Sequence, residues 1–315
     1  MLSRVAEALF WIGRYVERAE DTARLLDVHF HEVLEDPNID ETAACAVLLT
    51  VMGVPYDTAR RYRDNRAVLE LLGYDGTAPN SIVGALVAAR ENARGVRQAL
   101  SADIWECLNA TRNALPARVA AARDFGPAPF FSYVRDRAAI FAGYAEASMS
   151  RDASHDMLVL GRSLERVDMT ARLIGVRIGT GRGGEGWTST LCACSAHDAY
   201  LRTYQEGVEP ARVLEFLLVD RLFPRSVFHA LQAGEEALAR LDPVPGRSAL
   251  DEPARRAIGR ARTDLEFLSA ANLIEDLPKR LHGLQRAVST VSEAVARRLF
   301  AGSAPLRWSI EEPAG

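Results

Sequence analysis

The sequence has 315 residues, of which 48% are hydrophobic and 25% charged, a composition typical of a globular protein large enough for two domains. The formal net charge of −4 argues against general nucleic-acid binding, which requires a basic excess. No apolar stretch of about 18 residues could span a membrane and the N-terminus lacks a signal-peptide pattern, so we expect a cytoplasmic protein with reduced thiols.

Nearly every segment of the chain predicts a helix, and the alternating patterns typical of strands are absent. The first six predicted helices cover 3–34, 41–53, 57–73, 81–101, 103–124 and 130–148. The next six cover 154–178, 188–205, 209–219, 225–241, 253–270 and 273–300. Turn-forming stretches such as "DPVPGRS" and "GTGRGGEG" separate them. We therefore predict an all-α helical bundle.

The first predicted helix carries the charged segment "GRYVERAEDTARLL". On a helical wheel Gly13, Glu17, Glu20 and Arg24 fall within about 60° of one another, opposite the apolar side. One interpretation is a solvated face with ion pairs along the helix, such as Arg14 with Glu17 and Glu20 with Arg24. The other is an inward-facing polar network that holds the molecule together, binds an acidic or phosphorylated ligand, or both.

The seventh predicted helix repeats this segment as "GRSLERVDMTARLI". Between Trp11–Leu26 and Val159–Ile174, at an offset of 148, 8 of 16 residues are identical. A second pair of blocks, 68–82 and 213–227, agrees at 7 of 15 positions at an offset of 145. Two matching blocks at similar offsets indicate an internal duplication of about six helices.

The duplication predicts a first helical repeat at 1–148, a second at 149–301 and an irregular tail at 302–315. We expect the two repeats to pack as one domain. The charged positions recur while their apolar neighbours drift, which favours the inward-facing network. Gly13 and Gly161 each cost about 1 kcal/mol relative to alanine inside a helix, so they predict a close approach of another backbone or a ligand.

A third charged stretch, "AARENARGVRQAL", places Arg90, Arg94 and Arg97 on one helix stripe. Arginine forks in a line suit carboxylate or phosphate groups. The counterpart in the second half, "AGEEALARL", lacks those arginines. The predicted site is therefore asymmetric.

The pattern Asp-x-x-x-Pro-x-Ser occurs before a predicted helix in each half. Ser81 and Ser226 are expected to cap those helices by accepting from free N–H groups. Helix N-termini also attract anions, and Arg225 lies beside one of them.

Other chemistries find less support in the sequence. The four cysteines are expected to be buried structural thiols. A di-metal bundle needs Glu-x-x-His motifs on facing helices, whereas this chain has Glu17-x-x-Glu20 and Glu165-x-x-Asp168. No Ser-His-Asp or Cys-His arrangement follows from spacing alone. A metal-dependent enzyme with carboxylate ligands is thus only the third hypothesis. Our prediction for this chain is no metal and no cofactor.

Several segments together resemble the bacterial alpha-E domain family. They are "LSRVAEALFWIGRYVERAEDTARLL", "SIVGALVAARENARGVR", "IWECLN", "LGRSLERVDMTARL" and "FPRSV", and the resemblance spans roughly 2–300. Members are similar in being encoded beside a circularly permuted ATP-grasp amidoligase and a transglutaminase-like cysteine peptidase. The resemblance therefore implies a partner or catalytic component of a peptide-ligase system, in which ATP is used by the partner.

The resemblance and the charged faces together define a candidate site for an acidic peptide, a carboxylate or a phosphate. Glu17 and Glu165 are the candidate general bases if the chain is catalytic. The predicted ligand-binding residues are Arg14, Arg18, Glu20, Arg24, Arg90, Glu91, Asn92, Arg94, Arg162, Arg166, Asp168, Arg172, Arg225 and Ser226. The alternative is a non-catalytic helical scaffold in which these charges form intramolecular ion pairs.

Overall fold

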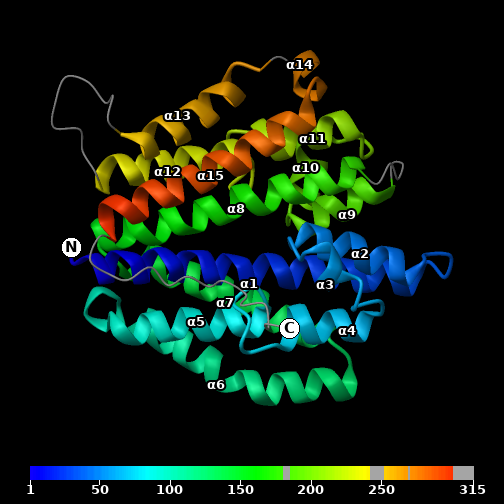
Figure 1. Ribbon diagram of the computed structural model, residues 1–315, viewed down its shortest axis with the longest axis horizontal. Coiled ribbons are helices and arrows are strands. Elements are labelled where there is room, and N and C mark those ends of the chain that lie inside the picture. The colour runs from blue at the N-terminus through cyan, green and yellow to red at the C-terminus, as the bar shows by residue number, and fades with distance from the viewer. Residues whose placement is uncertain (180–184, 242–251, 269, 301–315) are drawn as a thin grey trace.

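The computed structural model describes residues 1–179, 185–241, 252–268 and 270–300, and the expected all-α class is confirmed (Figure 1). Within those ranges the chain forms helices and contains no strand. The α-helices are α1 (Ser3–Glu35), α2 (Glu41–Val51), α3 (Tyr56–Ala59), α4 (Asn65–Leu69), α5 (Ile82–Gly95), α6 (Ala102–Phe125), α7 (Ala128–Ser148), α8 (Ala153–Gly179), α9 (Glu185–Ala193), α10 (His197–Tyr204), α11 (Pro210–Val219), α12 (Val227–Leu241), α13 (Pro253–Glu266), α14 (Ala270–Ile274) and α15 (Leu277–Leu299).

The long helices form two rings of four helices each, and the rings meet in the middle of the molecule along what we call the seam. Helices α1, α5, α6 and α7 pack in one closed ring, and α8, α12, α13 and α15 pack in the other. The seam is made by α1 and α8, which lie side by side across the middle of the molecule (Figure 1). The short helices α2 and α9 each contact both members of this pair. The proposed duplication and its boundaries stay predictions from the sequence.

The helix starts at Ser81 and Ser226 follow the expected capping chemistry. The Ser81 hydroxyl oxygen accepts from the backbone N–H of Gly84 at 2.9 Å, and that of Ser226 accepts from His229 at 3.1 Å. Each hydroxyl also donates to a carbonyl six residues earlier, that of Asp75 or Asp220. Both serines are fully buried, so each cap fixes the turn that leads into α5 or α12.

The close approach expected at the two glycines is confirmed. A methyl group at Gly13 would overlap the carbonyl oxygen of Leu158, and one at Gly161 would overlap that of Phe10. Further along, Arg18 meets Glu165, so later residues of α1 face later residues of α8. The two helices therefore run parallel and cross in backbone contact at their glycines.

Four predicted helices are interrupted. In the segment 81–101 the α-helix ends at Gly95 and a 3-10 turn, Arg97–Ala99, follows. The segment 57–73 divides into α3, α4 and a π-helical turn, Glu70–Tyr74. The segment 188–205 breaks where Ser195 adopts a φ of 53°, and 273–300 starts anew after Asp276 at 54°. Left-handed residues end a helix because the i to i−4 ladder cannot continue through them.

Two further expectations have different outcomes. Cys45, Cys107 and Cys194 are buried as expected, but Cys192 is exposed, so the prediction was wrong for that thiol. It lies on the side of α9 turned away from the core that holds Cys194. The tail 302–315 and most of "GTGRGGEG" lie outside the described residues.

Alanine at either crossing glycine is predicted to destabilise the fold. We expect Gly13→Ala and Gly161→Ala each to cost about 1–3 kcal/mol of unfolding free energy or more, because the new methyl group meets backbone rather than a movable side chain. Urea denaturation measures this. The control is Gly143→Ala on the exposed side of α7, where no atom lies within 4 Å of the added methyl. That variant should gain up to about 1 kcal/mol. Equal midpoints for all three variants would contradict the crossing.

Candidate functional site

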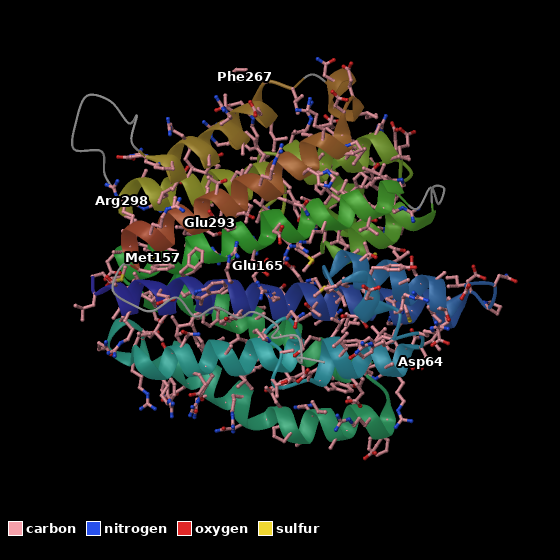
Figure 2. All side chains as sticks on the ribbon, viewed as in Figure 1. Asp64, Met157, Glu165, Phe267, Glu293 and Arg298 are labelled. Atoms are coloured by element: carbon pink, nitrogen blue, oxygen red, sulfur yellow. The ribbon has the colours of Figure 1, made fainter. Side chains whose placement is uncertain are left out.

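Two crossed ion pairs join α1 to α8 just beyond the glycines. The Nε and Nη2 of Arg18 donate to the two carboxylate oxygens of Glu165 at 2.5 and 3.0 Å. The Nε and Nη2 of Arg166 donate to those of Glu17 at 2.7 and 2.8 Å. Figure 2 shows Glu165 between the ribbons of α8 and α1. We call these four residues the ion-pair lock, and both of its pairs are two-bond forks.

The crossed pairing follows from helix geometry. Glu17 and Arg18 are adjacent and point about 100° apart, so the two side chains face different neighbours. In a parallel pair that is in register, each glutamate instead faces the arginine of the other helix. The third donor of each arginine is used as well, since Arg18 Nη1 lies 3.4 Å from the carbonyl oxygen of Pro79 and Arg166 Nη1 lies 2.9 Å from that of Pro224. The lock therefore also holds the turns that precede α5 and α12.

Burial makes the lock electrostatically strong. The side chains of Glu17 and Glu165 are only 3% and 5% exposed. Burial alone would raise the pKa of Glu17, but the charges of Arg166 and Arg225 outweigh it and hold the pKa at about 2. The pKa of Glu165 is lowered for the same reason: burial is outweighed by the Arg18 charge. Both glutamates are thus ionised at neutral pH, and a carboxylate with a lowered pKa whose two oxygens are held by an arginine is a weak proton acceptor. Their role as general bases stays a prediction.

Arg225 makes one side of the site different from the other. It contacts Glu17 at 3.1 Å, Glu20 at 2.5 Å and Asp21 at 2.8 Å. The position 145 residues earlier is Asn80, which cannot supply this charge. The N–H donors of Arg225, which were expected to bind an anion, therefore point at three acids of α1.

Asp21 carries the excess negative charge of this cluster. Burial, together with the nearby charge of Glu17, raises the pKa of Asp21 to about 8, although Arg225 opposes the shift. Glu17 and Glu20 also have Arg166 and Arg24 as partners, whereas Asp21 has only the shared Arg225 among the residues that the structure describes. Burial therefore outweighs the attraction of Arg225, and Asp21 is the group that holds a proton at neutral pH.

The remaining predicted residues of α1 and α8 pair locally or across the seam. Arg24 bonds Glu20 at 2.7 Å, which confirms that pair, and Arg172 bonds Asp168 at 2.9 Å. The expected pair of Arg14 with Glu17 is wrong, because the crossing turns Arg14 toward α8. Its Nε lies 3.6 Å from Glu165, whose oxygens are already held by Arg18.

Arg14 and Arg162 occupy matching positions but have different surroundings. The Nε and Nη2 of Arg14 are buried without a hydrogen bond, and its guanidinium lies over the rings of Phe10 and Trp11. Burial lowers the pKa of Arg14. Arg162 instead has an additional acid, Glu146, at 3.6 Å. Arg14 is therefore the less compensated cation of the site.

The charged stretch on α5 is not brought to the lock. Arg90 donates to Asn109 of α6 at 3.2 Å and to its neighbour Glu91 at 2.5 Å, and Arg94 also contacts Glu91, at 2.9 Å. Asn92 donates to a carbonyl of its own helix. These side chains bond within α5 and to α6, away from Glu17 and Glu165. Their role in ligand binding stays a prediction, as it does for Ser226, whose hydroxyl serves as a helix cap.

The space beside the lock is small. A cavity of about 50 Å³ lies among α1, α7 and α8, lined by Glu17, Glu146, His155, Arg162 and Arg166, among others. That volume holds about one or two water molecules, far less than a peptide needs. Within the described residues no group of three or more His, Cys, Asp or Glu side chains is placed to hold a metal ion.

The structure also brings together three residues that spacing did not connect, Cys45, His29 and Asn65. The Sγ of Cys45 lies 4.0 Å from His29 Nε2, and that same nitrogen lies 2.8 Å from Asn65 Oδ1. A nucleophilic triad needs the two ring nitrogens to face different partners. Burial also raises the pKa of Cys45 to about 12 and lowers that of His29. The cluster is therefore a packed polar contact between α1, α2 and α4.

Neutralising one acid of the lock is predicted to cost much more than neutralising an exposed one. Glu17→Gln leaves Arg166 buried without its anion and removes one of the three acids around Arg225, so we expect a loss of about 3–5 kcal/mol in urea unfolding. The matched control is Glu70→Gln. The Nε and Nη2 of Arg123 donate to the two carboxylate oxygens of Glu70 at 2.9 and 2.6 Å, but both side chains are about half exposed. That variant should lose at most about 1 kcal/mol. Similar losses in the two variants would contradict the role of the lock.

Asp21 is predicted to give the fold a pH dependence between about 4 and 8. Its pKa is about 8 in the folded protein against an ordinary 3.8, so the folded state keeps a proton that the unfolded state releases. The contribution of Asp21 to the free energy of unfolding therefore falls as pH rises through that window and levels off above it. The variant Asp21→Asn has no titrating group at this position, so it lacks this pH-dependent contribution. The difference between wild type and variant, measured by urea unfolding at several pH values, should decline with rising pH; a constant difference would contradict the assignment.

Comparison with known proteins places this architecture in a family. The family model Alpha-E, described as a predicted alpha-helical domain with a conserved ER motif, matches residues 1–300. Glu-Arg occurs twice in the chain, at Glu17–Arg18 and at Glu165–Arg166, and both occurrences form the lock. No solved structure matches.

Similar curated proteins are uncharacterized proteins of Mycobacterium bovis and of two strains of Mycobacterium tuberculosis. Each is 29% identical over 337 residues, which cover 96% of this chain but 38% of the relative, so the chain spans well under half the length of these relatives. Among the described helices none is both long and apolar enough to cross a membrane. The match over nearly the whole described chain establishes that this protein belongs to the Alpha-E family.

Proposed function

We propose that this protein is a non-catalytic helical partner in an ATP-grasp amidoligase system, and that its charged α1 and α8 faces lock its two halves together. The observation that carries the scaffold reading is the crossed lock itself. Its glutamates and arginines bond one another in buried forks, and only about 50 Å³ remains beside Glu17. A face that is satisfied internally and closed to a peptide suits a structural role better than a substrate site.

The partner role rests on the resemblance and on the lengths of the relatives. A domain that matches 38% of a longer chain is used there together with other sequence, as expected of a module that works with an enzyme. The proposed companions are the ATP-grasp amidoligase, which would use the ATP, and the transglutaminase-like cysteine peptidase. An acidic peptide would then belong to the assembly and would meet the ligase active site rather than the lock.

A second candidate function is supported by Arg14. Its buried Nε and Nη2 lack hydrogen bonds, and its carboxylate neighbour Glu165 is already held by Arg18. An under-compensated arginine favours a small anion such as phosphate or a dicarboxylate. A rise in the thermal midpoint on adding inorganic phosphate, lost in Arg14→Met, would support this reading over the scaffold.

The scaffold proposal predicts that the lock can be replaced by apolar residues without loss of activity. The double variant Arg18→Met with Glu165→Met removes both charges of one pair at once, which costs less than leaving Arg18 buried alone, although Arg14 then loses its nearest acid. We expect it to bind the ATP-grasp ligase and to support ATP-dependent peptide ligation as wild type does, per folded molecule. Co-purification and ADP release with the purified ligase are the measurements.

Each result of that experiment separates the readings. Ligase bound and ligation lost in the folded double variant would show that the pair takes part in chemistry or ligand binding. No binding of ligase by the wild-type chain would refute the partner role. The single variant Glu165→Gln serves as a control for stability, because it leaves Arg18 buried alone.

A further inference from the structure

A second cavity lies away from the lock, where α1 and α8 separate. It has a volume of about 860 Å³ and opens between the C-terminal halves of these helices, with α2 and α9 as its other walls. In Figure 1 those four helices meet at the right-hand side of the molecule. The volume is within the range of about 300–1,000 Å³ that is usual for binding sites. We call it the seam groove.

The seam groove follows from the crossing geometry. α1 and α8 touch at Gly13 and Gly161, and Leu25 lies about 18 Å further along the helix. Helices that cross in contact at one point diverge from it, so a gap opens between their later turns. The floor of the gap consists of apolar pairs spaced three residues apart on each of three helices: Leu25 and Val28, Leu48 and Val51, and Leu173 and Val176.

The rim of the groove on α1 is acidic. Glu32, Glu35 and Asp36 line it, and none of them forms an ion pair with any residue that the structure describes. They stand at the C-terminal end of α1, whose last turn contains no basic residue. The helix dipole is negative at that end, so it adds to their charge instead of offsetting it. The rim therefore favours a cation from outside the chain.

The opposite wall does not supply that cation. Arg177 of α8 reaches the groove, but its guanidinium lies over the ring of Trp187 and packs against Gly186 of α9. The rest of that wall carries neutral hydroxyl groups, those of Thr188, Ser189 and Thr190. The groove thus combines an apolar floor with a negative edge along one side.

We propose that the seam groove binds a basic amphipathic helix of a partner protein. Apolar side chains at i, i+3 and i+4 would insert between α1 and α8, and Lys or Arg on one flank would meet Glu32, Glu35 and Asp36. This is the helix-in-groove mode of recognition. The inference deepens the proposed function and rests on it for the view that the occupant belongs to a partner chain.

The test uses a model peptide of about 14 residues made of leucine and lysine in an amphipathic helical pattern, with a leucine–glutamate peptide of the same pattern for comparison. Fluorescence anisotropy measures binding of each labelled peptide to the full chain. We expect the lysine peptide to bind and the glutamate peptide to bind far more weakly. Equal binding of the two peptides would overturn the proposal.

Two groove variants and one matched control locate the site. Glu32→Gln with Glu35→Gln and Asp36→Asn should weaken binding of the lysine peptide about tenfold or more, a loss that corresponds to at least one lost charge contact. The control triple Glu106→Gln, Asp124→Asn and Glu215→Gln changes the net charge equally at exposed sites elsewhere and should leave binding unchanged. Equal weakening by both triples would mean that peptide and protein attract only through net charge, which would overturn the proposal.

The apolar wall that α2 contributes to the groove is tested by Val47→Arg. Val47 lines the groove on α2 and is 36% exposed, so its replacement should fold and place a cation where the peptide is proposed to sit. We expect a further loss of about tenfold in peptide affinity with an unchanged thermal midpoint. Unchanged affinity would overturn the proposal, as would a dimer of the wild-type chain in sedimentation that Val47→Arg dissociates, because a second copy would then be the occupant.

This experiment and that on the ligase can fail separately. Peptide binding depends on the groove alone, whereas co-purification depends on the partner role. If the wild-type chain binds the lysine peptide through the groove but not the ligase, the groove stands and the proposed partner is wrong. If it binds the ligase and no groove variant alters peptide binding, the partner stands and the groove proposal is refuted.

Discussion

Glutamate and arginine stand at adjacent, largely buried positions on α1 and again on α8, and the rest of this fold depends on how those charges are neutralised. Glu17 and Arg18 point in different directions from α1, and Glu165 and Arg166 do the same from α8. Only a parallel partner in register presents the opposite charge to each. Since the charges are buried, a slip of one residue would leave two unpaired ions in the core. The lock therefore fixes direction and register together.

The glycines and the charges act as one device. Gly13 and Gly161 let the two backbones touch, which brings the next turn close enough for two-bond forks between side chains. The contact also sets the point from which the helices diverge. A single crossing thus produces a tight, polar and closed region in the next turn and an open, apolar groove further along the same two helices. The first is suited to holding the halves together and the second to receiving something else.

The two sides of the lock are not equal, and burial explains why the difference matters. Arg225 adds a cation next to Glu17 and is shared with Glu20 and Asp21, and burial raises the pKa of Asp21 so that it keeps a proton at neutral pH. On the other side Arg14 has less acid around it than its donors need. Charge imbalance in a buried network is costly, which makes these two residues the points at which pH or a small anion would act on the fold.

The sequence by itself determined the all-α class, most helix bounds, the caps at Ser81 and Ser226 and the close approach at the two glycines, because each of these depends on local chemistry or on a residue with no side chain. It also singled out the charged faces, but not their partners. The pairing of Arg14 with Glu17 was wrong because a helical wheel shows one helix only, whereas the ion pairs form between two. Only the tertiary structure decided that the Glu-Arg pairs cross, that the α5 arginines lie elsewhere, and that a groove opens beyond the crossing. Those features depend on how helices far apart in the chain are set against each other, and no local pattern encodes that.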